Sequence, residues 1–273
     1  MTTTTSLAER DESRIRSGLG RALGVINIIA ERAPETLGVS TIARELALPK
    51  AVAYRILKEL VADGFLSFNE ETKRYRLGAG ALAVGLAALR ALDVPDTARR
   101  YLGRLVRDSG ETATLSVRQG WFRVYIDQVL SPHEVCMSVS LGTRHALHSG
   151  SSSKAILAAL PDGEIAEYLG QPLARVTPYT ITDPHLLREE LARIRLRGYA
   201  VSIGERQNGA GSVAAPVRYA TGHVFGSISL CGPQDRFTPE ACAAHGALVA
   251  AAAAEISAEL GYRPPRLGGG AGE

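Results

Sequence analysis

The sequence predicts an α+β protein of two domains, and three observations lead to this prediction. First, a chain of 273 residues is longer than a typical domain with a single hydrophobic core. Second, residues 13–78 show three helical patterns followed by two short β-prone runs. Third, residues 95–261 mix helical and β-prone segments in an order that suits a mainly antiparallel sheet.

Capping residues and apolar spacing mark the first two helices. Ser17 can cap a helix in which apolar side chains recur at helical spacing over residues 19–29. A second, short helix is expected over Val39–Leu46, with Ser40 or Thr41 as its N-cap.

The third helix and the segments after it complete the first domain. Proline at the first position favours a helix over Pro49–Ala62, and Asp63-Gly64 ends it. The β-prone runs Phe65–Phe68 and Arg74–Leu77 are joined by a polar stretch, which predicts a hairpin. Helix, helix, turn, helix, hairpin is the order of a winged helix-turn-helix, which we assign to residues 13–78.

A linker helix is expected next, within residues 79–94. Ala79–Leu92 is apolar, with Leu82, Leu86 and Leu89 on one stripe, and it ends before Val94-Pro95. We expect this helix to transmit signals between the domains and to contact a second copy of the chain.

The second domain is assigned to residues 95–261. Its expected strands are Thr112–Val117, Trp121–Val129, Val135–Val139, Tyr199–Ile203, Gly211–Arg218 and Val224–Leu230. Its expected helices cover residues 96–108, 151–160, 162–169, 183–198 and 238–260. Residues 1–12 and 262–273 carry no such pattern and are expected to be a disordered leader and tail.

Charge and composition exclude several classes of protein. Residues 13–78 hold 11 Lys and Arg against 7 Asp and Glu, whereas residues from 79 onward hold 19 against 18. A basic first domain on a neutral body suggests that only the first domain meets a polyanion. Three cysteines without ligand spacing, with no signal peptide and no membrane-spanning segment expected, indicate a cytoplasmic protein without metal or cofactor.

In a helix-turn-helix, the second helix of the motif enters the major groove with its first turns facing the bases. Here those turns carry small residues, which allow close approach, and donors for phosphates and bases. The hairpin tip is also basic, which suits contact with an adjacent groove. The candidate DNA-contacting residues are Ser40, Thr41, Lys50, Ala51, Ala53, Tyr54, Arg55, Lys58, Lys73, Arg74 and Arg76.

Several segments in series resemble one family. The stretch TIARELALPKAVAYRILKELVADGFL, followed by RYRLG, resembles the DNA-binding half of the IclR family of bacterial transcriptional regulators. HALHSGSSSKAILAAL, TITDPHLLREELARIRLRGYAVSIGERQNGAGSVAAPV and GSISLCGP resemble that family's effector-binding domain. The resemblance runs from about residue 18 to residue 261. It implies a GAF-like sensor domain, a homodimer or homotetramer, and binding to palindromic double-stranded DNA under control of a small-molecule effector.

The effector pocket is expected where a serine-rich loop, residues 149–153, enters a helix. Backbone N–H groups and hydroxyls converge at that positive helix end and suit a carboxylate. Two departures from the family pattern, Ser153 in place of glycine and Arg206 in place of a second glutamate, favour an anionic or polyhydroxylated ligand, such as an organic acid or a catabolic metabolite. The candidate effector-contacting residues are His148, Ser149, Gly150, Ser151, Ser152, Ser153, Ser212, Ser229 and Cys231.

Three alternatives stay open at this point. The serines can simply cap the helix, and Cys231 can be a small buried apolar residue. Ser151 and Lys154 have the S-x-x-K spacing of serine acylases, although the companion motifs S-D-N and K-T-G are missing. Finally, the chain can be a ligand-sensing protein that does not bind DNA.

Overall fold

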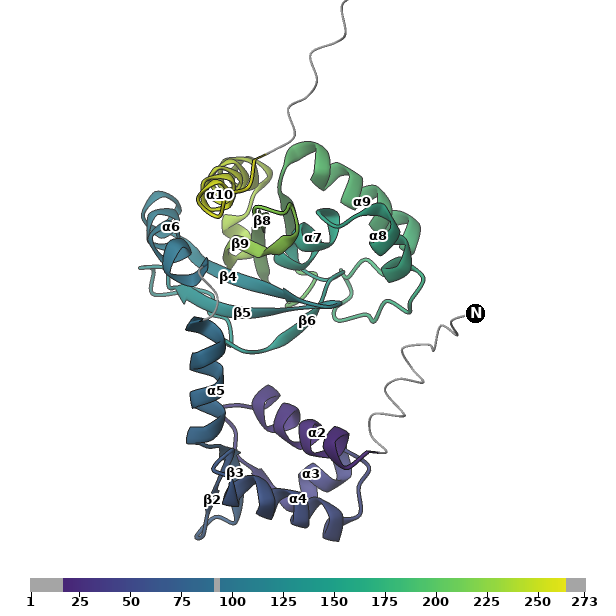
Figure 1. Ribbon diagram of the computed structural model, residues 1–273. Helices are drawn as coiled ribbons and strands as arrows, with labels where there is room; N and C mark the ends of the chain where they lie inside the picture. The colour runs from purple at the N-terminus through teal and green to yellow at the C-terminus, as the bar shows by residue number, and fades with distance from the viewer. Residues whose placement is uncertain (1–16, 91–93, 264–273) are drawn as a thin grey trace, which may run out of the picture. The chain divides into compact units, whose positions relative to one another are not determined.

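The computed structural model describes residues 17–90 and 94–263. The chain divides after residue 92 into two compact units (Figure 1). The expected leader, residues 1–12, lies outside the described residues. Of the expected tail, Tyr262 and Arg263 are described, and the Tyr262 backbone N–H donates a hydrogen bond to the Ser257 carbonyl over 2.8 Å.

The first unit has the predicted helix-turn-helix and hairpin, together with one strand that the sequence did not suggest. Its helices are α2 (Gly18–Glu31), α3 (Val39–Glu45), α4 (Lys50–Ala62) and α5 (Ala79–Arg90). Its strands are β1 (Leu37–Gly38), β2 (Leu66–Asn69) and β3 (Arg74–Leu77). They form an antiparallel sheet in the order β1-β3-β2. The two residues of β1 are too few to give a periodic pattern.

The core of this unit is formed by the apolar faces of α2, α3, α4 and the three strands. Val25, Ile42, Leu57 and Leu66 are at most 2% exposed and pack together with the buried ring of Tyr75. The Ser17 hydroxyl caps α2, accepting the Gly20 N–H over 2.9 Å, as predicted. The expected cap of α3 is wrong, because that helix starts at Val39 and its N-cap is Gly38, without a side-chain hydrogen bond.

The second unit is built on a six-stranded antiparallel sheet in the order β6-β5-β4-β9-β8-β7. The strands are β4 (Thr112–Gln119), β5 (Phe122–Val129), β6 (Arg144–Ala146), β7 (Ala200–Ile203), β8 (Ala210–Arg218) and β9 (Val224–Pro233). The helices are α6 (Val94–Ser109), α7 (Ser151–Ala158), α8 (Asp162–Leu169), α9 (Pro184–Arg197), the 3-10 turn η1 (Gln234–Arg236) and α10 (Pro239–Glu259). The predicted α+β class and the mainly antiparallel sheet are therefore confirmed.

Helices cover both faces of this sheet (Figure 1). α6 and α10 pack together and against β4, β8 and β9, whereas α7 packs against β8, β9 and α9. α10 is long and apolar enough to cross a membrane by length and composition alone. However, Val249, Ala252 and Ile256 are at most 1% exposed against the sheet, so its apolar character belongs to the core of this unit.

One predicted strand is wrong. Residues 135–139 run beside β5 without joining the sheet, and the strand that pairs with β5 is β6. Side chains replace the missing ladder: the Gln128 amide donates to the Val139 carbonyl over 3.0 Å and accepts the Val139 N–H over 2.9 Å. The Thr112 hydroxyl donates to the Met137 carbonyl over 2.7 Å. A local β-prone pattern cannot show whether the backbone N–H and C=O groups pair with a neighbouring strand or with side chains.

Candidate ligand pocket and nucleic-acid interface

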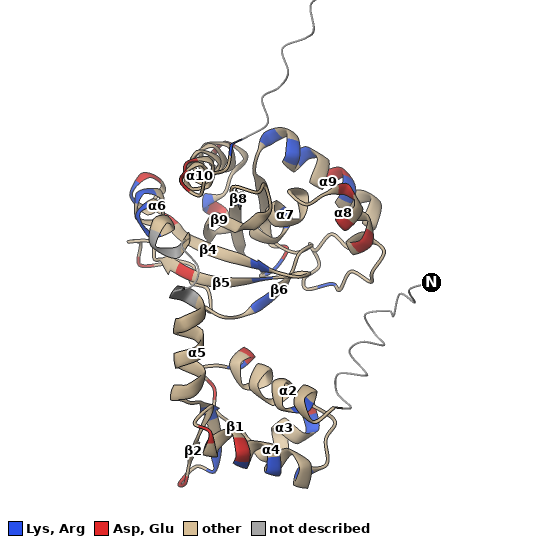
Figure 2. Cartoon of the chain, in the orientation of Figure 1, with Lys and Arg blue, Asp and Glu red and all other residues tan. Residues whose placement is uncertain are grey.

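α4 presents a basic face and buries the opposite one. Lys50, Ala51, Tyr54, Arg55 and Lys58 are all exposed, and Figure 2 marks the basic residues of this helix. Ala53 has no exposed surface, because it faces the core with Ile56 and Leu57. The structure therefore corrects the expectation for Ala53, which has no surface available to touch DNA.

The remaining candidate DNA residues lie on α3 and on the β2–β3 hairpin. Ser40 is exposed and Thr41 is half-buried in the first turn of α3. At the hairpin, Lys73 has a positive φ of 54° and forms an exposed ion pair with Glu70 over 3.2 Å. Arg74 donates to the Thr36 carbonyl over 2.5 Å, so part of its guanidinium is already used within the unit. Arg76 is exposed, and it lies on the same face of β3 as Arg74.

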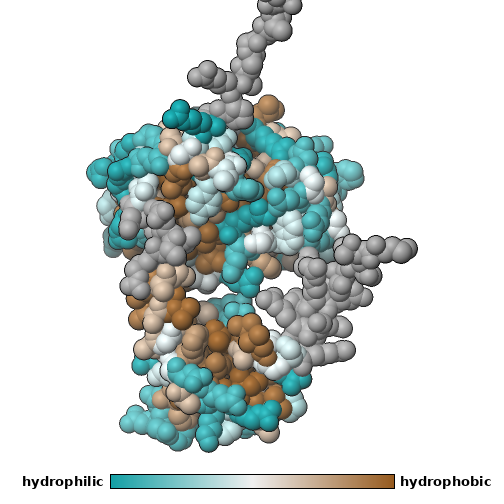
Figure 3. Space-filling model, in the orientation of Figure 1, coloured by the Kyte–Doolittle hydropathy of each residue, from teal (hydrophilic) through white to brown (hydrophobic). Residues whose placement is uncertain are grey.

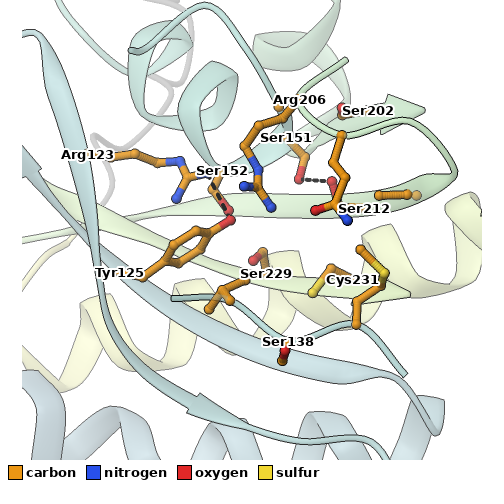
Figure 4. Close-up of a pocket in the computed structure, with 16 residues that line it drawn as sticks. Arg123, Tyr125, Ser138, Ser151, Ser152, Ser202, Arg206, Ser212, Ser229 and Cys231 are labelled. Carbon is orange, nitrogen blue, oxygen red and sulfur yellow. Dashed lines mark hydrogen bonds between the residues drawn. The ribbon is translucent and has the colours of Figure 1, made fainter. Parts of the chain in front are cut away.

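The second unit contains a pocket lined by several serine hydroxyls, one of them on β9 beside a row of paired hydroxyls between β4 and β9 (Figure 4). β4 and β9 pair so that Thr114 faces Ser229 and Ser116 faces Ser227. The two pairs of hydroxyl oxygens lie 2.6 and 3.0 Å apart. Ser229 and Cys231 share a face of β9 and line the pocket. Burial raises the pKa of the Cys231 thiol to about 12, so this thiol is neutral at neutral pH.

The first turn of α7 forms one wall of the pocket. Gly150 precedes it with φ at +89°, a conformation that favours glycine and lets the loop turn into the helix. The Ser151 hydroxyl donates to the Ser212 hydroxyl on β8 over 2.7 Å, and Ser152 also lines the pocket. The Gly150 N–H donates to the Glu205 carboxylate over 3.2 Å, which ties the loop to residues after β7.

Two arginines reach the pocket from different elements (Figure 4). Arg123 on β5 is 1% exposed, and its guanidinium carbon lies 4.0 Å from the centre of the Tyr125 ring. The guanidinium carbon of Arg206, from the loop after β7, lies 5.8 Å from the same centre. Burial lowers the pKa of His145 to about 3, and the neighbouring charges of Arg123 and Arg206 act in the same direction. The local field is therefore positive.

The structure brings together six of the nine predicted pocket residues and leaves three elsewhere. Gly150, Ser151, Ser152, Ser212, Ser229 and Cys231 line the pocket. His148 instead lies with its ring nitrogens 2.8 Å from the Tyr168 hydroxyl and 2.8 Å from the Ala174 carbonyl. Ser149 donates to the Glu205 carbonyl, and Ser153 accepts from Arg123 Nε over 2.7 Å. The polar atoms of these three side chains already form hydrogen bonds within the fold.

Sequence reasoning missed part of the lining. The residues it missed are Arg123, Tyr125, Met137, Ser138, Val139, Ser202, Gln207, Ala210 and Gly211, while Arg206 was noticed only as a departure from the family pattern. A signal existed for two of them: Arg123 and Tyr125 stand two apart in a β-prone run, so they share a face of the sheet. Nothing in the sequence shows which face that is.

Lys154 is engaged in a way that does not support acylase chemistry. Its ammonium lies 2.5 Å from a Glu205 oxygen and 3.6 Å from a Glu190 oxygen, and its side chain is 2% exposed. A general base must be neutral, whereas two nearby carboxylates stabilise the charged ammonium. The Ser151 hydroxyl donates to Ser212 instead. Within the described ranges, no three His, Cys, Asp or Glu side chains gather in a way that could hold a metal ion.

A helix-turn-helix with a hairpin, followed by a sheet domain with a polar pocket, defines the class of ligand-responsive DNA-binding regulators. Residues 18–70 match the model of the IclR helix-turn-helix domain, and residues 86–258 match that of the bacterial transcriptional regulator IclR C-terminal domain. The chain belongs to the IclR family of bacterial transcriptional regulators, and it is not an enzyme.

Relatives match over nearly the full length of the chain. The HTH-type transcriptional repressor AllR of Klebsiella pneumoniae is 32% identical over 247 residues, which are 90% of each protein. The crystal structure of the Thermotoga maritima IclR is 33% identical with a TM-score of 0.69, covering 89% of this chain and 98% of that one. An IclR homologue from Microbacterium hydrocarbonoxydans, complexed with 4-hydroxybenzoate, is 26% identical with a TM-score of 0.74, covering 89% and 99%.

Proposed function

We propose that this regulator is a cytoplasmic protein that binds a small organic acid or catabolic metabolite in the pocket of its second unit. In this proposal, the bound acid changes the affinity of the first unit for its operator. The observation that carries the proposal is the lining of the pocket, which has two arginines and, among the described residues, no carboxylate. The 4-hydroxybenzoate complex of the Microbacterium homologue supports an acid as the class of effector.

The experiment for the effector is a thermal-shift screen of the full chain against small organic acids and neutral analogues. A compound that binds only the folded state raises the unfolding temperature by mass action. Hits are then added to a fluorescence anisotropy titration of operator DNA. The proposal requires at least one acid that changes operator affinity, and that loses this effect in a Ser151→Ala, Ser212→Ala double variant. An effect that persists in the double variant would place the effector elsewhere.

We further propose that α4 is the recognition helix and that the hairpin contacts the adjacent DNA. Lys50, Tyr54, Arg55 and Lys58 offer exposed donors on one face, and Lys73, Arg74 and Arg76 offer them on the hairpin. The exposed small side chain of Ala51, with Ser40 and Thr41 on α3, completes the surface. Phosphate contacts position a protein, whereas base contacts specify the sequence.

The two roles separate in a binding experiment. Arg55→Ala is expected to reduce discrimination between operator and random DNA by roughly tenfold, the range of one lost base contact. Lys73→Ala is expected to weaken both kinds of binding alike and to make the dependence of log Kd on log salt shallower. Exposed Arg188 on α9 of the second unit gives the control, Arg188→Ala. If Arg55→Ala discriminates as well as the parent, α4 does not read the sequence.

We also propose that the chain acts as a homodimer, or as a homotetramer made of two dimers, on a palindromic operator. Large apolar side chains stay exposed on the first unit, and Figure 3 shows hydrophobic surface over α2 and α5. They are Leu19, Leu23, Leu82, Val84 and Leu86. Exposed apolar surface of this kind favours association with another copy of the chain. Light scattering should give a lower molar mass for the assembly of a Leu82→Glu, Leu86→Glu double variant than for the parent. The molar mass of a Leu196→Glu variant, changed on α9, should equal that of the parent.

A further inference from the structure

We infer that the pocket selects a compact dianionic organic acid, whose two carboxylates neutralise Arg123 and Arg206. This inference deepens the proposed function and rests on it, because it specifies the ligand class of the same pocket. Three features of the described residues carry it: an unpartnered buried nitrogen, an unbalanced charge and a small cavity.

The guanidinium of Arg123 has one nitrogen without a partner. Nε donates to the Ser153 hydroxyl over 2.7 Å, and one terminal nitrogen donates to the Tyr125 hydroxyl over 2.8 Å. The other terminal nitrogen, Nη1, is buried and has no hydrogen-bond partner in the structure. A buried donor of a charged group is costly to leave unpaired, so this nitrogen defines a position for an acceptor atom. Figure 4 shows the guanidinium pointing toward the other pocket side chains.

Among the described residues, the lining of the pocket has two positive charges and no negative charge to balance them. Arg123 and Arg206 both line the cavity, and no Asp or Glu among the described residues lines it with them. The nearest acid of the loop, Glu205, is turned away and paired with Lys154. Burial lowers the pKa of Arg123, and the charge of Arg206 lowers it further, so the surroundings of Arg123 in the pocket disfavour its positive charge. A ligand with one negative charge leaves one guanidinium unbalanced, whereas a dianion balances both.

The remaining polar groups suit carboxylate oxygens. The N–H groups in the first turn of α7 have no acceptor within the helix, and they form the positive end of its dipole. The hydroxyls of Ser151, Ser212 and Ser229 lie around the same cavity. Each hydroxyl can donate to an oxygen after a small rotation, because its present partner is another hydroxyl.

The cavity is small, with a volume of about 30 Å³. A cavity needs roughly 10–15 Å³ to hold one water molecule, so this one holds about two. Arg206 lines the cavity and is half-buried, so its side chain can shift outward to make room for a ligand larger than two water molecules. The small volume of the cavity favours a ligand with a short chain and few apolar atoms between its two carboxylates.

The test is isothermal titration calorimetry on the full chain. The probes are malonate, succinate and glutarate, with propionate and monomethyl succinate as single-charge analogues, and with sulfate as an inorganic dianion. The variants are Arg206→Gln and Arg123→Gln, with Arg188→Gln on the exposed face of α9 as the matched control. Arg206 is half-buried and has no ion pair to any described residue, so Arg206→Gln is expected to fold, which circular dichroism verifies.

We expect one of the dicarboxylates to bind at least tenfold more tightly than propionate and monomethyl succinate. Arg206→Gln should remove that preference, and Arg188→Gln should keep it. Equal binding of a dicarboxylate and its monomethyl ester, unchanged binding in Arg206→Gln, equally tight binding of sulfate, or no binding by any probe at millimolar concentration would each overturn the inference.

The proposed function fails in a different way. If a neutral or singly charged metabolite binds and loses its effect in the Ser151→Ala, Ser212→Ala variant, the pocket remains the effector site and only the dianion is wrong. If no ligand depends on any pocket residue, the proposed function fails as well.

Discussion

Lys154 shows how a single buried charge holds the pocket wall in place. Its ammonium contacts Glu205 and Glu190, and Glu205 also accepts the N–H of Gly150 at the start of α7. Burial raises the pKa of Glu205, although the neighbouring Lys154 acts against that rise. Removing one partner of such a pair leaves the other charge buried and unbalanced, which is the expensive case.

Glu205→Gln should therefore destabilise the second unit by about 3 kcal/mol, at the lower end for a broken buried pair because Glu190 remains nearby. The measurement is urea unfolding followed by fluorescence of Trp121, the only tryptophan of the chain, which packs beside Tyr168. Glu189→Gln, on the exposed face of α9, is the control and should change stability by less than about 0.5 kcal/mol. Unfolding of Glu205→Gln at the parent midpoint would show that the pair contributes nothing.

His145 gives a prediction about pH. Its pKa in the folded chain is about 3, because burial and the charges of Arg123 and Arg206 disfavour the imidazolium. An unfolded histidine has a pKa of about 6.5, so between these two values the unfolded state binds more protons than the folded state. Stability therefore rises with pH across this window and is lost as the pH falls below about 6.5.

The loss should not exceed about 1.4 kcal/mol per pH unit. Comparison of urea midpoints at pH 7 and pH 5 isolates it, since His145→Asn should lose less stability over this interval than the parent does. Proton NMR provides a second readout, in which the His145 ring signals of the folded protein stay unchanged down to pH 5. A ring that titrates near its ordinary pKa would show that burial and the two arginines do not disfavour the imidazolium.

At the level of elements, local sequence patterns predicted the helices better than they predicted which segments pair as strands. Helices α2, α3 and α4 of the first unit follow from apolar spacing and turn residues, which are local signals. Residues 135–139 are as β-prone as a true strand, but side chains of Gln128 and Thr112 satisfy their backbone. The sequence also offered no way to see that Arg123 points inward, because the inward face of a strand depends on its neighbours in the sheet.

The segment that replaces the wrongly predicted strand is itself testable. Gln128 holds Val139 with two hydrogen bonds, and residues 137–139 line the pocket. Gln128→Ala should leave the fold intact, since each bond contributes only about 1 kcal/mol. It should also raise amide hydrogen exchange in the peptide covering residues 135–143, while peptides of β8 and β9 stay protected.

Gln171→Ala is the matched control, because Gln171 forms a long side-chain bond to Glu167 within exposed surface. Its exchange pattern should equal that of the parent. Unchanged exchange over residues 135–143 in Gln128→Ala would mean that other contacts hold this segment.

At the scale of the whole molecule, ligand binding in one unit must be coupled to DNA binding in the other. The pocket belongs to the unit after residue 92, and α4, the proposed recognition helix, belongs to the unit before it. A ligand can shift DNA affinity only by the amount by which it prefers one state of the chain over another. Linkage then requires that DNA shift ligand affinity by the same factor.

We therefore predict that the two coupling factors are equal. A duplex selected by the protein from random sequences serves as operator, and the tightest dicarboxylate of the calorimetric series serves as ligand. Anisotropy gives the operator Kd with and without ligand, and calorimetry gives the ligand Kd with and without operator. The two ratios should agree and lie between about 5 and 150, the range of typical coupling free energies. Arg206→Gln should bring both ratios toward one together, whereas Arg188→Gln should change neither. A ratio that changes on the DNA side alone would show that the acid acts outside the pocket, for example by competing with phosphates at α4.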